Sequence, residues 1–232
     1  GDYWVPLDGT VPEGKSAQLT TGLEWEPSRK YKVTVESYYT DLSGLVLLDN
    51  NTSVDSRAAT SEDIFISAGT GHATGVEIFA EKRTGRLRGW LGYTLGRTRR
   101  SFDDVDDGRE FAPKYDRRHD LSVVGSYRRG LWRFGSSFVY GTGQAYTPAS
   151  ARYTLRDPAT GVAQDRVLAA PRNSARLLPY HRLDVSLRRQ LRLFGAEAEW
   201  YVQIFNLYSR RNEWFVQYDT DAPQTEPDVV LQ

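Results

Sequence analysis

The chain has 232 residues, which is long enough for one large all-β domain or two small ones. Its 30 Lys and Arg residues balance 30 Asp and Glu residues, so it lacks the global basic field that draws proteins onto nucleic acid. It contains no Cys, which excludes disulfides, thiolate metal sites and Cys nucleophiles.

No stretch of about 18 apolar residues occurs, and the N-terminus has no basic segment followed by an apolar one. We therefore expect neither a transmembrane helix nor an intact signal peptide. The mean hydropathy of -0.57 still permits a membrane-spanning β-structure, because its strands place apolar side chains only at every second position.

Residues 17–40 show the strict alternation of a two-faced β-hairpin. Before the turn, Leu19 and Leu23 lie on an apolar side, and polar residues lie between them. After the turn, Val33 and Val35 repeat the pattern. The same unit recurs over residues 74–96, 120–141 and 182–204. The sequence therefore predicts eight strands in four antiparallel hairpins.

The connections alternate between short and long. Short turns are expected near residues 27–30, 83–86, 128–131 and 192–195. Long polar segments lie between the hairpins, at about residues 49–70, 100–117 and 142–178. Short turns on one rim and long loops on the other are typical of outer-membrane barrels, whose short turns are periplasmic.

The predicted strands are about 10 to 13 residues long, whereas strands of soluble sheets cluster near 5 or 6. A tilted strand needs about 9 to 11 residues to cross the hydrocarbon layer of a membrane. Aromatic residues also flank the predicted strands, as in the girdles of such barrels. Trp25, Tyr31, Tyr127 and Trp132 lie beside short turns, and Tyr39 and Tyr140 lie toward the long loops. The fold class favoured is an all-β antiparallel meander of transmembrane β-hairpins. The alternative is that the rings fill the core of a soluble sandwich.

Catalysis is not expected. His119 adjoins Asp120, but neighbours on a strand point to opposite faces, so the two cannot form a base and its orienting group. No G-x-S-x-G elbow is present, and the strand serines lack a nearby His at a convincing offset. We name no catalytic residue.

The aspartates at 103, 104, 106 and 107 precede Gly108 and resemble an oxygen-rich calcium loop. They do not match the EF-hand pattern, so a solvated surface loop is favoured over calcium bridging at the lipopolysaccharide surface. We assign no metal site and no cofactor. A group of basic residues at the same rim is interpreted as ordinary surface charge. The more specific alternative is that these residues bind lipid A phosphates. The group consists of Arg99, Arg100, Lys114, Arg117 and Arg118.

The polar side of the hairpins carries both signs of charge, as a hydrated lumen or a docked plug would require. Its charged members are Lys32, Glu36, Glu77, Glu81, Arg88, Arg182, Asp184, Arg188, Glu197 and Glu199. Phe79 and Trp90 interrupt this side. A ligand site would be built by the long loops, where Tyr146, Tyr153 and Trp214 could stack on a ligand. The sequence does not rank these residues, so the ligand-binding residues stay unknown.

Six runs of the chain resemble the last strands of TonB-dependent outer-membrane receptors in their order and spacing. They are YYTDLSGLV (38–46), GHATGVEIFAEK (71–82), GWLGYTLGRT (89–98), YDRRHDLSVVGSYR (115–128), LPYHRLDVSL (178–187) and VQIFNLYSRRN (202–212). The resemblance covers nearly the whole chain from about Lys15. It implies a 22-stranded barrel closed by an N-terminal plug, which imports a scarce ligand such as a metal chelate, a vitamin or a glycan with energy from the inner membrane.

Eight strands, or nine if residues 213–218 add one, are too few for such a barrel. The resemblance also implies a terminal aromatic residue, whereas this sequence ends Val229-Val230-Leu231-Gln232. We therefore expect residues 1–232 to be one partial barrel domain, a fragment that lacks the plug and the final strand. Unpaired sheet edges are not viable in lipid, so other segments or chains should complete the barrel.

The expected location is the bacterial outer membrane. The expected partners are outer-membrane lipid and lipopolysaccharide, the remaining barrel and plug, and TonB through the missing N-terminal part. Two alternatives remain open. One is a passive porin or purely structural barrel, and the other is a soluble β-sandwich or glycan-binding module.

Overall fold

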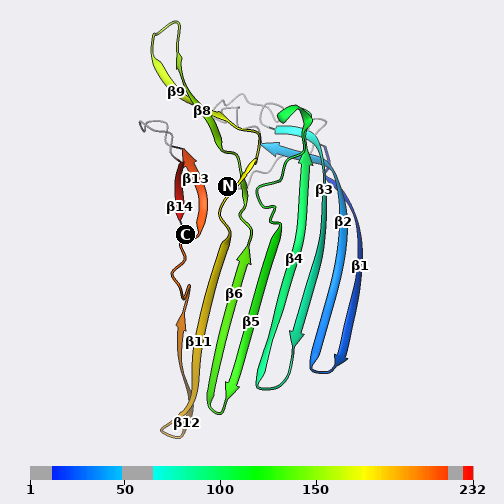
Figure 1. Ribbon diagram of the computed structural model, residues 1–232, viewed down its shortest axis with the longest axis vertical. Helices are drawn as coiled ribbons and strands as arrows, with labels where there is room; N and C mark the ends of the chain where they lie inside the picture. Colours follow the sequence, from blue (N-terminus) through cyan, green and yellow to red (C-terminus); the bar gives the residue numbers. More distant parts are fainter. Residues whose placement is uncertain (1–11, 49–64, 219–226, 232) are drawn as a thin grey trace.

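The computed structural model describes residues 12–48, 65–218 and 227–231 of the chain. Most of these residues lie in one antiparallel sheet of eight strands, ordered β1-β2-β3-β4-β5-β6-β11-β12 (Figure 1). The strands are β1 (Lys15–Ser28), β2 (Tyr31–Leu48), β3 (Phe65–Lys82), β4 (Leu87–Ser101), β5 (His119–Arg129), β6 (Trp132–Gly141), β11 (Tyr180–Leu193) and β12 (Ala196–Ile204). The predicted four hairpins are confirmed.

Strand lengths in this sheet range from 9 residues in β12 to 18 in β2 and β3, so several strands are longer than the sequence suggests. Each hairpin closes through a tight turn. Three of these turns contain a glycine with positive φ, at Gly85 (102°), Gly130 (60°) and Gly195 (84°). A residue with a side chain rarely adopts this conformation, which explains why the chain reverses at these positions.

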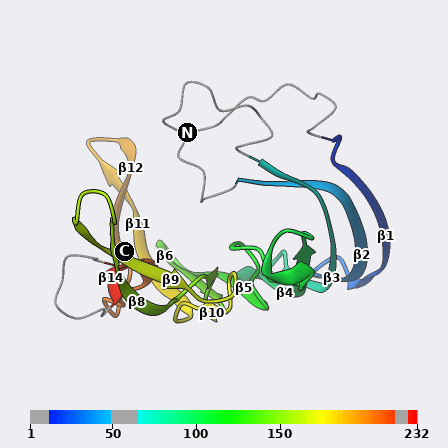
Figure 2. The ribbon, with the colours of Figure 1, turned by 90° about the horizontal axis from the view of Figure 1, so that it is seen from above.

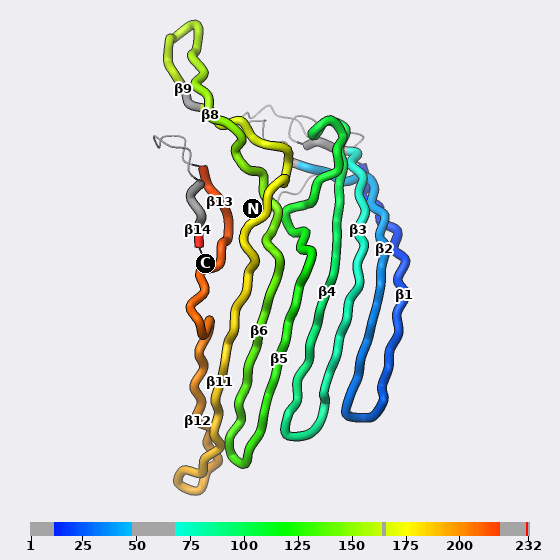
Figure 3. The backbone as a smooth tube through the Cα atoms, in the orientation of Figure 1, coloured from blue at the N-terminus to red at the C-terminus, as the bar shows by residue number. Residues whose placement is uncertain are grey.

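The short turns lie at one end of the sheet and the long connections at the other (Figures 1 and 3). Viewed from above, the sheet is bent into an open arc (Figure 2). Within the described residues, β1 and β12 each pair with one sheet neighbour only, so both edges are open.

The connection between β6 and β11 contains structure that the sequence did not reveal. It holds β7 (Ala145–Tyr146), β8 (Ala149–Arg156), β9 (Ala163–Ala169) and β10 (Ala175–Arg176). β7 pairs with β10, and β8 pairs with β9 as a projecting hairpin. The connection therefore leaves the sheet, folds on itself and returns to place β11 beside β6.

Residues 213–218 do form a strand, β13 (Glu213–Tyr218), but this strand does not join the sheet. It pairs with β14 (Pro227–Leu231) in a separate two-stranded sheet. The possible ninth strand is therefore present but is not part of the eight-stranded sheet, since its backbone groups pair with β14. Gln232 and the loop over residues 49–64 lie outside the described residues.

The buried core lies at the long-loop end of the sheet and not along its length. Within the described residues it is a small cluster of Phe102, Val105 and Phe111 in the connection between β4 and β5, against which Leu45 and Leu47 pack. Large apolar side chains of the sheet are exposed instead. The residues that the structure describes form no second layer over them, which argues against the soluble sandwich. The described helical structure is one 3-10 turn, η1 (Asp106–Gly108), and no described helix could cross a membrane.

Candidate functional site

The register of the sheet aligns apolar residues of neighbouring strands into rows on one surface, here called the apolar face. One row runs through directly paired residues Val35, Ile78, Tyr93, Leu121, Tyr140 and His181. Another runs through Leu87, Tyr127, Phe134, Leu187 and Val202. Paired residues point to the same side of a sheet, so the alternation read from single strands becomes one continuous surface.

The height of the apolar face can be estimated on β4. Leu95 and Leu87 belong to its outermost apolar rows and lie eight residues apart. At a rise of about 3.4 Å per residue this separation is about 27 Å along the strand, or about 20 Å in height for a tilt of about 40°. This height is close to that of the apolar band of outer-membrane barrels, which is about 25 Å tall.

Charged side chains and rings border the apolar face at both ends. At the short-turn end, Trp132 pairs across the sheet with both Arg129 and Arg189. Arg189 lies over the Trp132 ring at 4.9 Å from its centroid, and Trp200 meets the same ring edge-on at 6.3 Å. At the long-loop end, a row of Asp41, His72 and Arg99 ends the apolar face. Trp132 therefore lies at the border, as the sequence predicted.

The opposite surface, here called the polar face, carries the predicted charges of both signs. Neighbouring strands pair some of them, as in Lys32–Glu24 at 2.6 Å and Arg188–Glu199 at 3.3 Å. Arg182 and Asp184 pair along β11 at 3.0 Å. Phe79 and Trp90, which interrupt the polar pattern in the sequence, stack on each other with ring centroids 6.1 Å apart. Two rings can therefore remain on a polar surface because they cover each other.

Two of the three histidines pair with tyrosines. His119 Nδ1 lies 2.8 Å from the Tyr93 hydroxyl, and His181 Nδ1 lies 2.8 Å from the Tyr208 hydroxyl. Asp120 instead forms an ion pair with Arg117 at 3.6 Å. The prediction that His119 and Asp120 do not form a dyad is therefore confirmed. His72 lies 3.6 Å from Glu110.

The connections over residues 102–118 and 142–179 pack against each other, and we call them the rim platform. Asp116, only 4% exposed, joins them. Its Oδ1 accepts a 2.7 Å hydrogen bond from the Thr98 amide, and its Oδ2 pairs with Arg176. Arg176 also donates to the carbonyl oxygens of Asp116 and Gly143, at 2.8 Å and 3.1 Å. One guanidinium therefore binds two connections that are distant in sequence.

A second set of contacts joins the same connections. The Arg172 amide donates to Asp106 Oδ2 at 2.6 Å, and Asn173 Nδ2 donates to the Ala112 carbonyl at 2.7 Å. The Asn173 amide donates to Thr147 Oγ1 at 3.0 Å. Asp106 is thus occupied in holding the platform together. Among the described residues no three His, Asp or Glu side chains are arranged to hold a metal ion.

The rim platform encloses an open cavity of about 800 Å³. This volume is within the range of about 300 to 1,000 Å³ that is usual for small-molecule sites. Basic, acidic and aromatic side chains line it together. They include Arg100, Lys114, Arg172, Asp104, Asp106, Phe111, Tyr115 and Tyr218. The Tyr115 hydroxyl accepts a 2.7 Å hydrogen bond from Arg100, which also lies over the Tyr115 ring.

The predicted basic group does not act as one cluster. Arg117 turns toward Asp120 and the Tyr180 ring, while Arg100 turns toward Tyr115 and the cavity. The three aromatics suggested for ligand stacking lie on three different small sheets. Tyr146 is on β7, Tyr153 is on β8 and Trp214 is on β13. Asp116, Arg176 and Asn173 were not singled out from the sequence, because no local pattern marks a contact between distant loops.

No family model and no curated protein matches the chain. Its fold is similar to solved structures of TonB-dependent outer-membrane receptors. The ferric citrate transporter FecA in its unliganded form is 13% identical, with a TM-score of 0.58, over 94% of this chain and 29% of FecA. BauA, the ferric preacinetobactin receptor from Acinetobacter baumannii, is 11% identical, with a TM-score of 0.56, over 92% of this chain and 27% of BauA.

The FrpB iron transporter from Neisseria meningitidis is 14% identical, with a TM-score of 0.54, over 89% of this chain and 28% of FrpB. The chain therefore spans less than a third of the length of each of these proteins. It has the fold of a wall segment from an outer-membrane receptor barrel.

Proposed function

We propose that this chain is a wall segment of a TonB-dependent outer-membrane receptor that takes up a metal chelate, with the rim platform at the extracellular surface. The proposal rests on two features that occur together. The sheet has an apolar face about as tall as a membrane, and it carries long folded loops at one end only. A passive barrel needs the apolar face alone. A receptor also needs an ordered surface on which a ligand can dock.

The choice of a metal chelate rests on the cavity of the rim platform. Arg100 and Lys114 bring positive charge to it, and Tyr115 provides an aromatic surface beside Arg100. Metal chelates with carboxylate or catecholate groups are anionic and often planar, so arginine and tyrosine are suited to bind them. A vitamin or a glycan would depend less on these positive charges.

On this proposal, the polar face lines a lumen. Its ion pairs, such as Arg188–Glu199, neutralise part of the charge that an ionic ligand would meet on its way through. The open edges at β1 and β12 are the places where the remaining barrel strands attach. The plug, the closing strand and the contact with TonB belong to the remainder of the protein.

The test uses the complete receptor, expressed in a Gram-negative host that lacks its own ferric-chelate receptors. Uptake of ⁵⁵Fe-labelled ferric chelates should be saturable and should disappear when the TonB gene of the host is deleted. Lys114→Gln should raise the concentration for half-maximal uptake by about threefold to tenfold, since one charge pair is lost at a partly wet site. The matched control is Arg156→Gln on β8, which lies outside the cavity lining and should leave uptake unchanged.

Uptake that persists without TonB, is not saturable and extends to unrelated small solutes would instead identify a passive porin. TonB-dependent uptake of a glycan or a vitamin that Lys114→Gln does not change would support the receptor function. It would contradict the proposal that the ligand is a metal chelate.

A further inference from the structure

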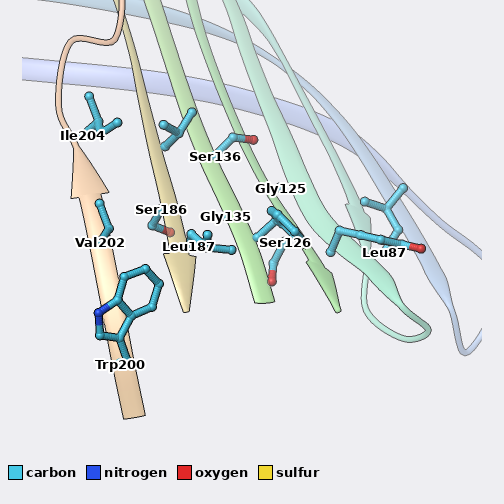
Figure 4. Close-up of a pocket in the computed structure, with 13 residues that line it drawn as sticks. Leu87, Gly125, Ser126, Gly135, Ser136, Ser186, Leu187, Trp200, Val202 and Ile204 are labelled. Carbon is cyan, nitrogen blue, oxygen red and sulfur yellow. The ribbon is translucent and has the colours of Figure 1, made fainter. Parts of the chain in front are cut away.

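The apolar face is not uniform, because a groove runs over β5, β6, β11 and β12 near the short-turn end. Its first part, about 530 Å³ in volume, is lined by Gly125, Ser136 and Leu187 (Figure 4), and also by Tyr127 and Phe134. Its second part, about 850 Å³ in volume, is also lined by Tyr127, Phe134 and Leu187 and reaches Trp132 at the border of the face. The two parts share Tyr127, Phe134 and Leu187, so they adjoin each other, and we call them together the groove.

The groove is hollow because small residues form its floor. Gly125 and Ser136 are direct partners across β5 and β6, on a row between larger apolar residues. A Cβ at Gly125 would lie 3.4 Å from Ser136 Oγ, so even one added methyl group would begin to fill the floor. Trp200 and Leu187 form walls on the β11 and β12 side (Figure 4). The lining of this part is almost entirely apolar, as an acyl chain requires.

The second part of the groove ends between two arginines. Arg129 and Arg189 both line it, and they flank Trp132 on adjacent strands. Neither forms an ion pair with a carboxylate in the part of the chain that the structure describes. Arg189 lies over the Trp132 ring, which holds its guanidinium at the border of the apolar face. Two uncompensated positive charges therefore lie one row beyond the apolar part.

We propose that this groove binds one anionic phospholipid of the periplasmic leaflet, with an acyl chain over Gly125 and Ser136 and the phosphate between Arg129 and Arg189. The order of the parts matches the order of groups in a lipid, from the membrane interior toward water. Arginine binds phosphate through several N–H donors, and it places its charge at the interface while its stem stays in the apolar layer. Free phosphate would use the arginines but not the groove.

This inference rests on the membrane placement in the proposed function but not on uptake of any ligand. It can therefore be tested in the complete purified receptor whether or not transport is observed. Heat-modifiable migration on gels checks that each variant is a folded barrel. Failure of lipid binding in a folded barrel would reject the groove and leave the receptor proposal in place.

The experiment measures lipids retained by the receptor in native mass spectrometry after incubation with equal amounts of phosphatidylglycerol and phosphatidylcholine. The wild type should retain one phosphatidylglycerol in preference to phosphatidylcholine. Arg129→Gln and Arg189→Gln should each weaken this binding about fivefold, as expected for one charge near a phosphate layer. Arg129→Lys and Arg189→Lys should retain most of it, because the positive charge remains.

Ser136→Leu should also reduce retention, because the leucine side chain fills the groove floor. Its matched control is Ser37→Leu on the same apolar face, which lies outside the groove and should bind lipid normally. Arg97→Gln, at the long-loop end, is the control for charge. Equal retention of both lipids, an unchanged preference in the arginine variants, or full displacement by inorganic phosphate would each overturn the proposal. If the wild-type receptor is a dimer and the Ser136→Leu variant is a monomer, the groove binds a second copy of the receptor instead of a lipid.

Discussion

Arg176 Nη2 forms an ion pair with Asp116 Oδ2, although the two residues lie 60 positions apart and belong to different connections of the sheet. The Asp116 side chain is almost fully buried, whereas that of Arg176 is 36% exposed. The carboxylate also binds the Thr98 amide at the end of β4. This pair fixes the rim platform to the top of the sheet and so shapes the cavity proposed for the ligand.

Substitution of Asp116 should loosen the rim platform while leaving the barrel wall intact. Asp116→Asn removes the charge pair but keeps an acceptor for the Thr98 amide, whereas Asp116→Ala removes both. We expect local destabilisation of about 1 to 3 kcal/mol for the alanine variant and less for the asparagine variant. Amide hydrogen exchange in residues 102–118 should report it.

The matched control is Asp107→Asn, because Asp107 is 89% exposed and its contact with Arg109 is long, at 3.4 Å. Such exposed pairs contribute little. Equal exchange in the Asp116 and Asp107 variants would show that the ion pair does not hold the platform.

A charge on the apolar face should be far more costly than the same charge on the polar face. Val123 lies on an apolar row near the middle of β5, and its neighbour Ser122 lies on the polar face beside Asp120. Val123→Arg should destabilise the barrel by about 2 to 4 kcal/mol, because a midplane arginine must leave water. Ser122→Arg should be tolerated.

Denaturant unfolding of the complete receptor in phospholipid vesicles measures this difference. A sheet with water on both faces would give a different result, because an arginine on either face would then contact water. Similar stabilities for the two variants would therefore argue against the membrane placement.

Asn212, only 3% exposed, bridges the backbone at the start of β11. Its Oδ1 accepts from the His181 amide at 3.1 Å, and its Nδ2 donates to the His181 carbonyl at 3.2 Å. Asn212→Ala should leave both part-buried backbone groups without this partner, at a cost of about 1 kcal/mol. The His181 amide should then exchange faster, whereas the exposed Gln217→Ala control should not change it.

The tip of the β8–β9 hairpin should be sensitive to acid. The Ala159 amide donates a hydrogen bond to the Asp157 carboxylate at 2.7 Å and, together with the Thr160 hydroxyl and amide, holds the pKa of Asp157 below its ordinary value of 3.8. A lowered folded pKa means that this turn is fully stabilised above about pH 4 and loses its support as the pH falls through the lowered value.

NMR titration of the Asp157 carboxyl should therefore give a midpoint below that of an unfolded peptide with the same sequence. Thr160→Ala should move the midpoint upward, because it removes the hydroxyl that contributes to the shift. A midpoint in the wild type equal to that of the peptide would contradict the hydrogen bonds at the hairpin tip.

The eight strands of the wall could be predicted because their signals are local. Alternation such as Leu19, Leu23 and Val33 depends only on the two-residue period of a strand, and the glycines at 85, 130 and 195 mark where the chain must reverse. Membrane placement followed from strand length and loop asymmetry. Strand length and loop asymmetry are the same in any fold that contains these hairpins.

The contacts that give the molecule its sites required the tertiary structure. Arg129, Trp132 and Arg189 form one border only because three strands align in a particular register, and a shift of one residue would turn each side chain to the other face. The strand at residues 213–218 was recognisable, but its partner was not, because pairing depends on where the chain returns. Asp116 and Arg176 meet for the same reason: loop folding brings together distant residues whose sequence neighbours carry no trace of the contact.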